Sequence, residues 1–173
     1  MSVDGFIAGP HDDLSFLHMV EQPGEDYGYT EFIAGVDTVL MGRKTYDVVQ
    51  SFGIDFPHRE RECYVFSHTR SGSEGQLHFT NEAPASLVKR LRQQDGRTIF
   101  VDGGAELVQE LLRNDCIDRM LISTIPCILS NGTRLFGDLP QPMNFELKSI
   151  KPFASSLVQL EYLRKKDQSN AEL

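Results

Sequence analysis

A glycine, two cations and a hydroxyl stand together at the expected start of a helix. The segment Met41–Tyr46 reads M-G-R-K-T-Y and follows an apolar run that is typical of a buried strand. Free N–H groups at a helix N-terminus attract anions, and Gly42 would let a phosphate approach the backbone. Arg43 suits forked contact with a phosphate, Lys44 adds charge, and Thr45 can donate its hydroxyl. The segment is a candidate phosphate site, although a plain strand-to-helix turn with solvated basic residues has the same pattern.

A pair of glycines marks a second junction between a strand and a helix. The segment Ile99–Leu107 reads I-F-V-D-G-G-A-E-L, so a buried strand opens onto a helix through Gly103 and Gly104. A pyrophosphate can lie against the backbone N–H groups at such a helix start. The G-x-G-x-x-G fingerprint is absent, however, and a plain turn is the other interpretation. Glu106 equally fits a carboxylate that stabilises the first turn of a helix.

Hydroxyls and cations also follow a third strand. Ser67-His68-Thr69-Arg70 comes directly after the apolar run Cys63–Phe66. In open α/β sheets, ligands bind beyond the carboxyl ends of the strands, so this group could hold a ribose 2′-phosphate. That contact would mean NADP rather than NAD. A polar turn that simply ends a strand is the equal alternative.

The elements that must position these groups alternate between strands and helices. Strands are expected at Val3–Ala8, Asp37–Met41, Cys63–Ser67, Gln76–Thr80, Thr98–Val101 and Asp118–Pro126. Helices are expected at Asp26–Ala34, Lys44–Ser51, Pro84–Gln94 and Ala105–Arg113. Phe145–Arg164 alternates as two strands around Lys151–Ser156. This order predicts a three-layer α/β/α fold with a mixed, mainly parallel sheet and a C-terminal antiparallel hairpin. We expect one domain over residues 1–164 and a frayed polar tail over 165–173.

Composition and charge exclude several classes of function. The 173 residues carry a net charge of −8, which opposes binding to nucleic-acid phosphates. The longest apolar runs, such as Met120–Pro126, are too short to cross a membrane, and no signal peptide is evident. The three cysteines form no C-x-x-C pair and the five histidines show no metal-binding spacing. We therefore expect a cytoplasmic protein with free thiols and without a metal site, a nucleic-acid partner or a membrane partner.

Six motifs occur in a specific order along residues 1–164. They are S-V-D-G-F-I-A (Ser2–Ala8), D-L-S-F-L (Asp13–Leu17), M-G-R-K-T-Y (Met41–Tyr46), V-F-S-H-T (Val65–Thr69), D-G-G-A-E-L (Asp102–Leu107) and I-P-C-I-L-S-N-G-T-R-L-F (Ile125–Phe136). This set resembles the dihydrofolate-reductase superfamily, in particular the C-terminal reductase domain of the bifunctional riboflavin-biosynthesis deaminase-reductase. Two features depart from the family pattern. The family's residues before S-V-D-G do not precede it here, so either the start is truncated or the first strand is unusually short. The family's L-G-x-G turn is replaced by Leu129-Ser130-Asn131-Gly132.

The resemblance implies a reductase that binds NADPH across the carboxyl edge of its sheet. Its substrate would be a small heterocycle, either pterin-like or a pyrimidine-ribosyl compound such as 5-amino-6-(5-phosphoribosylamino)uracil. Relatives commonly form homodimers, and the terminal hairpin could supply the contact. The residues expected at the cofactor are Ala8 beside the nicotinamide; Gly42, Arg43, Lys44 and Thr45 along one side; Gly103, Gly104, Ala105 and Glu106 at the pyrophosphate; and Ser67, His68 and Arg70 at the 2′-phosphate.

Two aspartates compete as the catalytic proton donor. Asp26 lies upstream of M-G-R, where dihydrofolate reductases carry their acid, and Asp4 lies in S-V-D-G, where riboflavin reductases also carry one. Each has a structural interpretation, since Asp26 suits a helix N-terminus and Asp4 can bond its own turn. Dihydrofolate reduction itself is less favoured because the W-x-L-P segment is missing and the chain has no tryptophan. A non-catalytic NADPH-binding module and a fold without any ligand are further alternatives.

Overall fold

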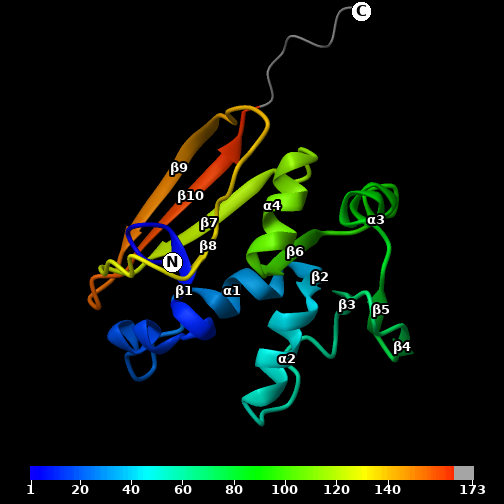
Figure 1. The fold of residues 1–173 in the computed structure, drawn as a ribbon, viewed down its shortest axis with the longest axis horizontal. Coiled ribbons are helices and arrows are strands. Elements are labelled where there is room, and N and C mark those ends of the chain that lie inside the picture. Colours follow the sequence, from blue (N-terminus) through cyan, green and yellow to red (C-terminus); the bar gives the residue numbers. More distant parts are fainter. Residues whose placement is uncertain (166–173) are drawn as a thin grey trace, which may run out of the picture. The chain divides into compact units, whose positions relative to one another are not determined.

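The computed structural model describes residues 1–165, and these form two compact units (Figure 1). One unit comprises residues 26–114, and the other joins residues 1–25 to the chain from Asp115 onward. We predicted one domain over residues 1–164, and that boundary stays a prediction. The expected frayed tail lies, from residue 166, outside the described residues.

The unit of residues 26–114 is built on a five-stranded sheet with the order β4-β5-β3-β2-β6. The strands β2, β3, β5 and β6 are parallel, and β4 is antiparallel to β5. In the register, Met41 pairs with Gly103 and Gly42 pairs with Phe66. The carboxyl ends of β2, β3 and β6 therefore meet at one edge. The strands are β2 (Val36–Gly42), β3 (Glu62–Phe66), β4 (Gly72–Glu74), β5 (Leu77–Thr80) and β6 (Thr98–Gly103).

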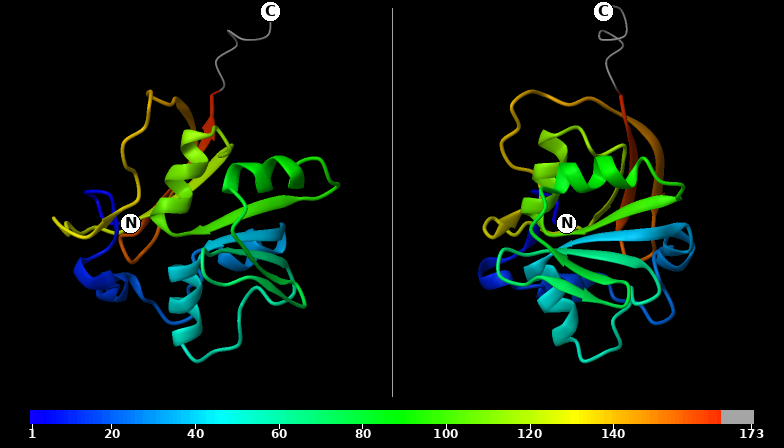
Figure 2. Two further views of the ribbon diagram at one scale, coloured as in Figure 1. Left: turned by 45° about the vertical axis from the view of Figure 1, so that its right-hand side comes forward. Right: turned by 90° about the vertical axis from the view of Figure 1, so that its right-hand side faces the viewer.

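Four helices cover the two faces of this sheet. They are α1 (Tyr29–Ala34), α2 (Arg43–Ser51), α3 (Pro84–Leu91) and α4 (Ala105–Arg113). Figure 2 shows α3 and α4 on one face and α2 on the other. Phe32 of α1 and Tyr46 of α2 pack against one apolar cluster, which is centred on buried Val39, Met41 and Val65. Because alternate strand residues point to opposite faces, the apolar runs of β2 and β3 fill both layers. The predicted three-layer α/β arrangement is confirmed.

The other unit contains two small antiparallel sheets. Strands β7 (Arg119–Thr124), β10 (Val158–Arg164) and β9 (Phe145–Pro152) form one, in that order. Strands β1 (Phe6–Ala8) and β8 (Thr133–Arg134) form the other. Two 3₁₀ helices, η1 (Pro10–Asp12) and η2 (Ser15–Val20), follow β1. The predicted C-terminal hairpin is confirmed as β9–β10, and β7 extends it to three strands.

Several element boundaries differ from the prediction. Strand β1 begins at Phe6 rather than Val3, because Gly5 N–H donates to Ser2 O and closes a turn. Helix α1 begins at Tyr29 rather than Asp26, and α3 ends at Leu91 rather than Gln94. Strands β4 and β8 and the two 3₁₀ helices are too short to show a period in the sequence. Among the described residues, no helix is long and apolar enough to cross a bilayer.

Candidate cofactor-binding site

The two glycine-containing junctions meet at the carboxyl edge of the five-stranded sheet. A Cβ atom added to Gly42 would lie 3.4 Å from the backbone nitrogen of Gly104 and 3.6 Å from the oxygen of Gly103. A Cβ added to Gly104 would lie 3.3 Å from the Thr45 hydroxyl oxygen. The peptide bond between Gly103 and Gly104 is cis. The close approach of the two backbones explains why small residues stand at both junctions.

Two helices begin at this same edge. Helix α2 starts at Arg43, directly after Gly42, and α4 starts at Ala105, directly after Gly104. Neither start carries a side-chain capping hydrogen bond. The first N–H groups of each helix have no acceptor within the helix, and both helix dipoles present their positive ends here. The edge is therefore suited to an anion, as the sequence predicts.

The third predicted group adjoins the first. Because Gly42 pairs with Phe66, the residues that follow them, Arg43 and Ser67, are brought to neighbouring positions. Ser67 is buried, and its hydroxyl oxygen accepts the N–H groups of Thr69 and Arg70 at 3.2 and 3.0 Å. The geometry is that of a polar turn ending a strand, and the turn fixes the backbone of Arg70.

Two arginines from this edge converge on a single carboxylate. Arg43 Nη1 donates to Asp47 Oδ2 at 2.6 Å, and Arg70 Nη1 donates to Asp47 Oδ1 at 2.8 Å. All three side chains are partly exposed, with 35% exposure for Asp47. The structure thus brings the predicted cations Arg43 and Arg70 together.

Four other predicted contact residues show no special geometry. Lys44, His68 and Glu106 are exposed, and Ala105 is buried as the first residue of α4. Glu106 stands in the first turn of α4, where its charge favours the helix dipole. Their roles at a cofactor stay predictions.

Asp26 closes the turn that leads into α1. Its Oδ1 accepts the N–H of Gly28 at 2.8 Å, and its Oδ2 accepts the N–H of Thr30 at 3.1 Å. These bonds satisfy N–H groups at the helix start, and the side chain is exposed. The geometry therefore supports the structural interpretation of Asp26, and its catalytic role stays a prediction.

Asp4, in the other unit, anchors the altered L-S-N-G turn. Its Oδ1 accepts the hydroxyl of Ser2 at 2.7 Å and the N–H of Leu129 at 3.1 Å, and its Oδ2 accepts the N–H of Ser130 at 2.8 Å. The bond from Ser2 and those from the turn lower the pKa of Asp4 to about 2. A carboxyl group that stays ionised at neutral pH is a poor proton donor.

The same turn explains why its glycine is retained. Gly132 has a φ of +127°, and a Cβ there would clash with the carbonyl oxygen of Ala8. Ala8 is buried in β1 and pairs with Thr133 of β8. The departure from L-G-x-G thus leaves a tight turn against β1. The predicted contact of Ala8 with a nicotinamide stays a prediction.

Sequence reasoning does not single out Asp102, which ends β6 immediately before the glycine pair. Its carboxylate is 26% exposed, and His58 Nε2 lies 3.2 Å from its Oδ2. His58 itself is almost completely buried, with its ring beside those of Phe56 and Phe100. Burial, and secondarily the charge of Asp102, raise the pKa of Tyr29. An acid directly before the glycines of V-D-G-G is the signal that could have identified this residue.

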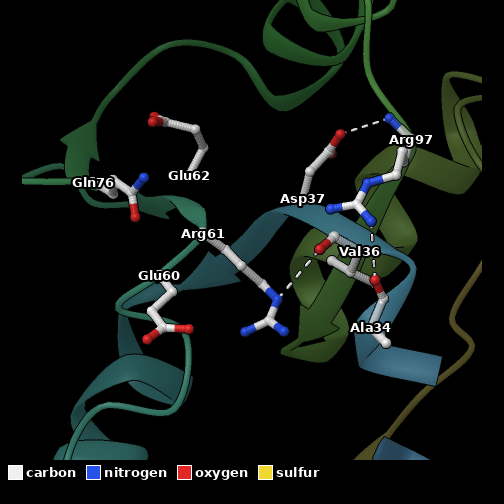
Figure 3. A pocket seen from close by; sticks show the side chains of 8 residues that line it. All are labelled: Ala34, Val36, Asp37, Glu60, Arg61, Glu62, Gln76 and Arg97. Carbon is white, nitrogen blue, oxygen red and sulfur yellow. Dashed lines mark hydrogen bonds between the residues drawn. The ribbon is translucent and has the colours of Figure 1, made fainter. Parts of the chain in front are cut away.

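One hollow in this unit lies at the opposite, amino end of the strands. It encloses about 400 Å³ between the starts of β2 and β3 and is lined by charged side chains (Figure 3). Arg61 donates to the carbonyls of Ile33 and Val36 at 3.2 and 3.3 Å, and Arg97 donates to that of Ala34 at 3.1 Å. These arginines hold the carboxyl end of α1. The two arginines that line this hollow therefore have a structural role.

Within residues 1–165, no three His, Cys, Asp or Glu side chains are grouped so that they could hold a metal ion. Among the described residues the three cysteines form no disulfide, and Cys63 and Cys116 are buried while Cys127 is partly exposed. Burial, followed by the charge of Asp102, raises the pKa of Cys63 to about 12, so this thiol is inert at neutral pH.

Comparison with known proteins places the fold among the dihydrofolate-reductase-like reductase domains. The chain belongs to the RibD C-terminal domain family, whose model matches residues 1–159. Two uncharacterised proteins of Bacillus subtilis (strain 168) are similar over nearly their whole length. YwjB is 37% identical over 95% of this chain and 94% of its own, and YyaP is 30% identical over 94% and 90%.

Solved structures give the same fold. A protein of Shewanella sp. PV-4 assigned to riboflavin biosynthesis superposes with a TM-score of 0.88 at 31% identity, with 96% of each chain covered. The diaminohydroxyphosphoribosylaminopyrimidine deaminase/5-amino-6-(5-phosphoribosylamino)uracil reductase of Thermotoga maritima gives a TM-score of 0.69 at 17% identity. That match covers 95% of this chain and 54% of the Thermotoga chain. The predicted family and fold class are confirmed, and a reductase-type role follows from the family.

Proposed function

We propose that the chain is an NADPH-dependent reductase of a small heterocycle. The substrate would be a pyrimidine-ribosyl or pterin-like compound. The activity would be most like that of a 5-amino-6-(5-phosphoribosylamino)uracil reductase. One observation carries the proposal: Gly42, Gly103–Gly104 and the Arg43–Arg70 pair lie at one sheet edge beside two helix starts. The name of the Thermotoga structure supports the substrate class.

Different residues at this edge would bind different parts of a dinucleotide. The backbone at Gly42 and Gly104 would receive the pyrophosphate, because no Cβ blocks it and helix N–H groups stand there. Arg43 and Arg70 would bind the 2′-phosphate through charge-assisted hydrogen bonds. Bound NADPH supplies the hydride, so the protein has to orient the nicotinamide and direct one proton.

Asp102 joins Asp4 and Asp26 as a candidate for the proton step. Asp4 and Asp26 use both carboxylate oxygens to hold backbone turns. Asp102 instead lies beside the glycine pair, with His58 holding one oxygen and part of the carboxylate exposed. We therefore favour Asp102 as the carboxylate that contacts the substrate and directs the proton, which solvent water supplies.

Titration calorimetry with NADPH and then NADH tests the cofactor part of the proposal. We expect NADPH to bind more tightly than NADH, and Arg43→Ala to weaken NADPH by about ten- to a hundredfold. Binding of neither nucleotide would reject the reductase assignment and favour a fold without a ligand.

Turnover separates an enzyme from a binding module. Oxidation of NADPH in the presence of 5-amino-6-(5-phosphoribosylamino)uracil or dihydrofolate, followed by absorbance, would establish catalysis. The dihydrofolate arm distinguishes the dihydrofolate-reductase alternative. Tight NADPH binding without oxidation in either arm would instead support the non-catalytic NADPH-binding module.

We also propose that the chain forms a homodimer through the β7-β10-β9 sheet. Leu147 and Ile150 of β9 are 45% and 58% exposed. They pair with Tyr162 and Leu160 of β10, which share one face of that strand. Leu160 and Tyr162 are half-buried, so these four side chains form an apolar strip of which Leu147 and Ile150 are the exposed part, and such a strip suits a contact between identical subunits.

A further inference from the structure

The carboxylate of Asp47 joins two parts of the cationic site that are distant in sequence. Arg43 lies four residues earlier on α2, and Arg70 lies in the turn after β3. One oxygen of Asp47 accepts from Arg43 at 2.6 Å and the other from Arg70 at 2.8 Å. The two guanidinium groups are thus held side by side, although their like charges repel.

We propose that Asp47 is a positioning residue that holds Arg43 and Arg70 as a pair for the 2′-phosphate, and thereby sets the preference for NADPH over NADH. The inference rests on the proposed NADPH-dependent function. It assigns to Asp47 no contact with the cofactor itself.

The donor inventory of arginine makes this arrangement possible. Each guanidinium carries five N–H donors, and the contact with Asp47 uses Nη1 in both cases. The Nε and Nη2 donors of Arg43 and Arg70 can therefore form the forked contact with a phosphate while Nη1 stays on Asp47. The phosphate therefore need not displace Asp47 from either guanidinium group.

The surroundings of Arg70 show that its position depends on several weak contacts. Its backbone N–H is held by the Ser67 hydroxyl, and its guanidinium lies 5.8 Å from the ring centre of Phe79 on β5. The side chain is 47% exposed, so neither contact fixes its rotamer. A free arginine loses substantial side-chain entropy when it binds a ligand, and pairing with Asp47 removes part of that cost before binding.

Electrostatic repulsion between Asp47 and the phosphate would act against this gain in NADPH affinity. Asp47 also places a negative charge near the incoming dianion, and a purely repulsive carboxylate would weaken NADPH binding. The site is partly exposed, where screening by water reduces such repulsion, whereas the loss of rotamer order is not screened. We therefore expect positioning to dominate.

The test is titration calorimetry of the full chain with NADPH and with NADH, which differ only in the 2′-phosphate. We expect Asp47→Asn to weaken NADPH by about tenfold and to change NADH by less than about twofold. Asp47→Glu, which keeps the carboxylate charge on a side chain one methylene longer, should retain most of the preference. Asp55→Asn is the matched control, because Asp55 pairs with Arg59 at the same four-residue spacing on the exposed surface.

The calorimetric results can contradict the proposed role of Asp47 in two ways. NADPH binding that is unchanged or tighter in Asp47→Asn overturns it, and so does an equal loss for both nucleotides, which would show a merely structural role. If wild-type protein binds neither nucleotide, the proposed function fails, and the inference fails with it. Asp47→Ser gives the same comparison if Asp47→Asn does not fold.

Discussion

Replacing the two adjacent glycines one at a time separates backbone strain from crowding at the sheet edge. Gly103 has a φ of +117°, a conformation that residues with a Cβ rarely adopt. A Cβ there would lie 3.8 Å from the Thr45 hydroxyl, which is ordinary contact. The cost of Gly103→Ala is therefore mainly strain, about 2 kcal/mol, or roughly a thirtyfold change in the folding equilibrium.

At Gly104 an added Cβ would cause crowding rather than backbone strain. Its φ of −81° suits any residue, but a Cβ would lie 3.3 Å from the Thr45 hydroxyl oxygen. That oxygen has to move by only a few tenths of an ångström, and the side chain of Thr45 is partly exposed. Gly104→Ala should therefore cost less than about 1 kcal/mol.

Urea unfolding followed by circular dichroism measures both costs. Gly75→Ala is a useful control, because Gly75 has a φ of +58° with nothing within 4 Å of its added Cβ, so about 1 kcal/mol is expected. Equal losses for Gly103→Ala and Gly104→Ala, or a larger loss for Gly104→Ala, would refute the reasoning from backbone conformation.

Three further predictions concern the acids and the assembly. The folded-state pKa of Asp4 is lowered to about 2 from 3.8, so its contribution to stability is present above pH 3.8 and lost as pH falls toward 2. Asp4→Asn should lower stability at neutral pH and flatten the acid unfolding curve over that window; a parallel curve would contradict this. Asp102→Asn should lower the kcat of NADPH oxidation by about a hundredfold while NADPH binding stays within about twofold, and an unchanged kcat would remove Asp102 from the proton step. Ile150→Lys should convert the proposed homodimer to a monomer in sedimentation experiments, whereas the exposed Ile54→Lys should not.

The positions of the three candidate groups at the sheet edge could be predicted from sequence because each group is a local pattern. An apolar run followed by Gly42 or by Gly103–Gly104 indicates a strand that opens onto a helix, and helices begin at Arg43 and Ala105 in the structure. The mainly parallel sheet follows from the alternation of strands and helices. That order alone predicts that the carboxyl ends of the strands share an edge.

The pairing within the site could not be predicted, because it depends on strand register. Arg70 and Asp47 are separated by 23 residues, and they meet only because Gly42 pairs with Phe66 across β2 and β3. The role of Asp4 likewise depends on a turn 125 residues away, whose Leu129 N–H it accepts. The sequence places an acid at each position, whereas only the structure shows that guanidinium groups donate to Asp47 and that backbone N–H groups donate to Asp4.

On the proposed function, the energies of the contacts at the edge predict which residues would select NADPH over NADH. A helix dipole at an exposed N-terminus stabilises an anion by about 0.3–1 kcal/mol, whereas a hydrogen bond to a charged group contributes about 1.5–3 kcal/mol. The glycine edge and the two helix starts would act on the pyrophosphate, which NADPH and NADH share. Arg43 and Arg70 would act on the 2′-phosphate, which only NADPH carries. Since the chain has a net charge of −8, this local pair also has to overcome a repulsive field. Variants at the glycine edge should therefore weaken both nucleotides alike, and variants of the arginine pair or of Asp47 should change the preference between them.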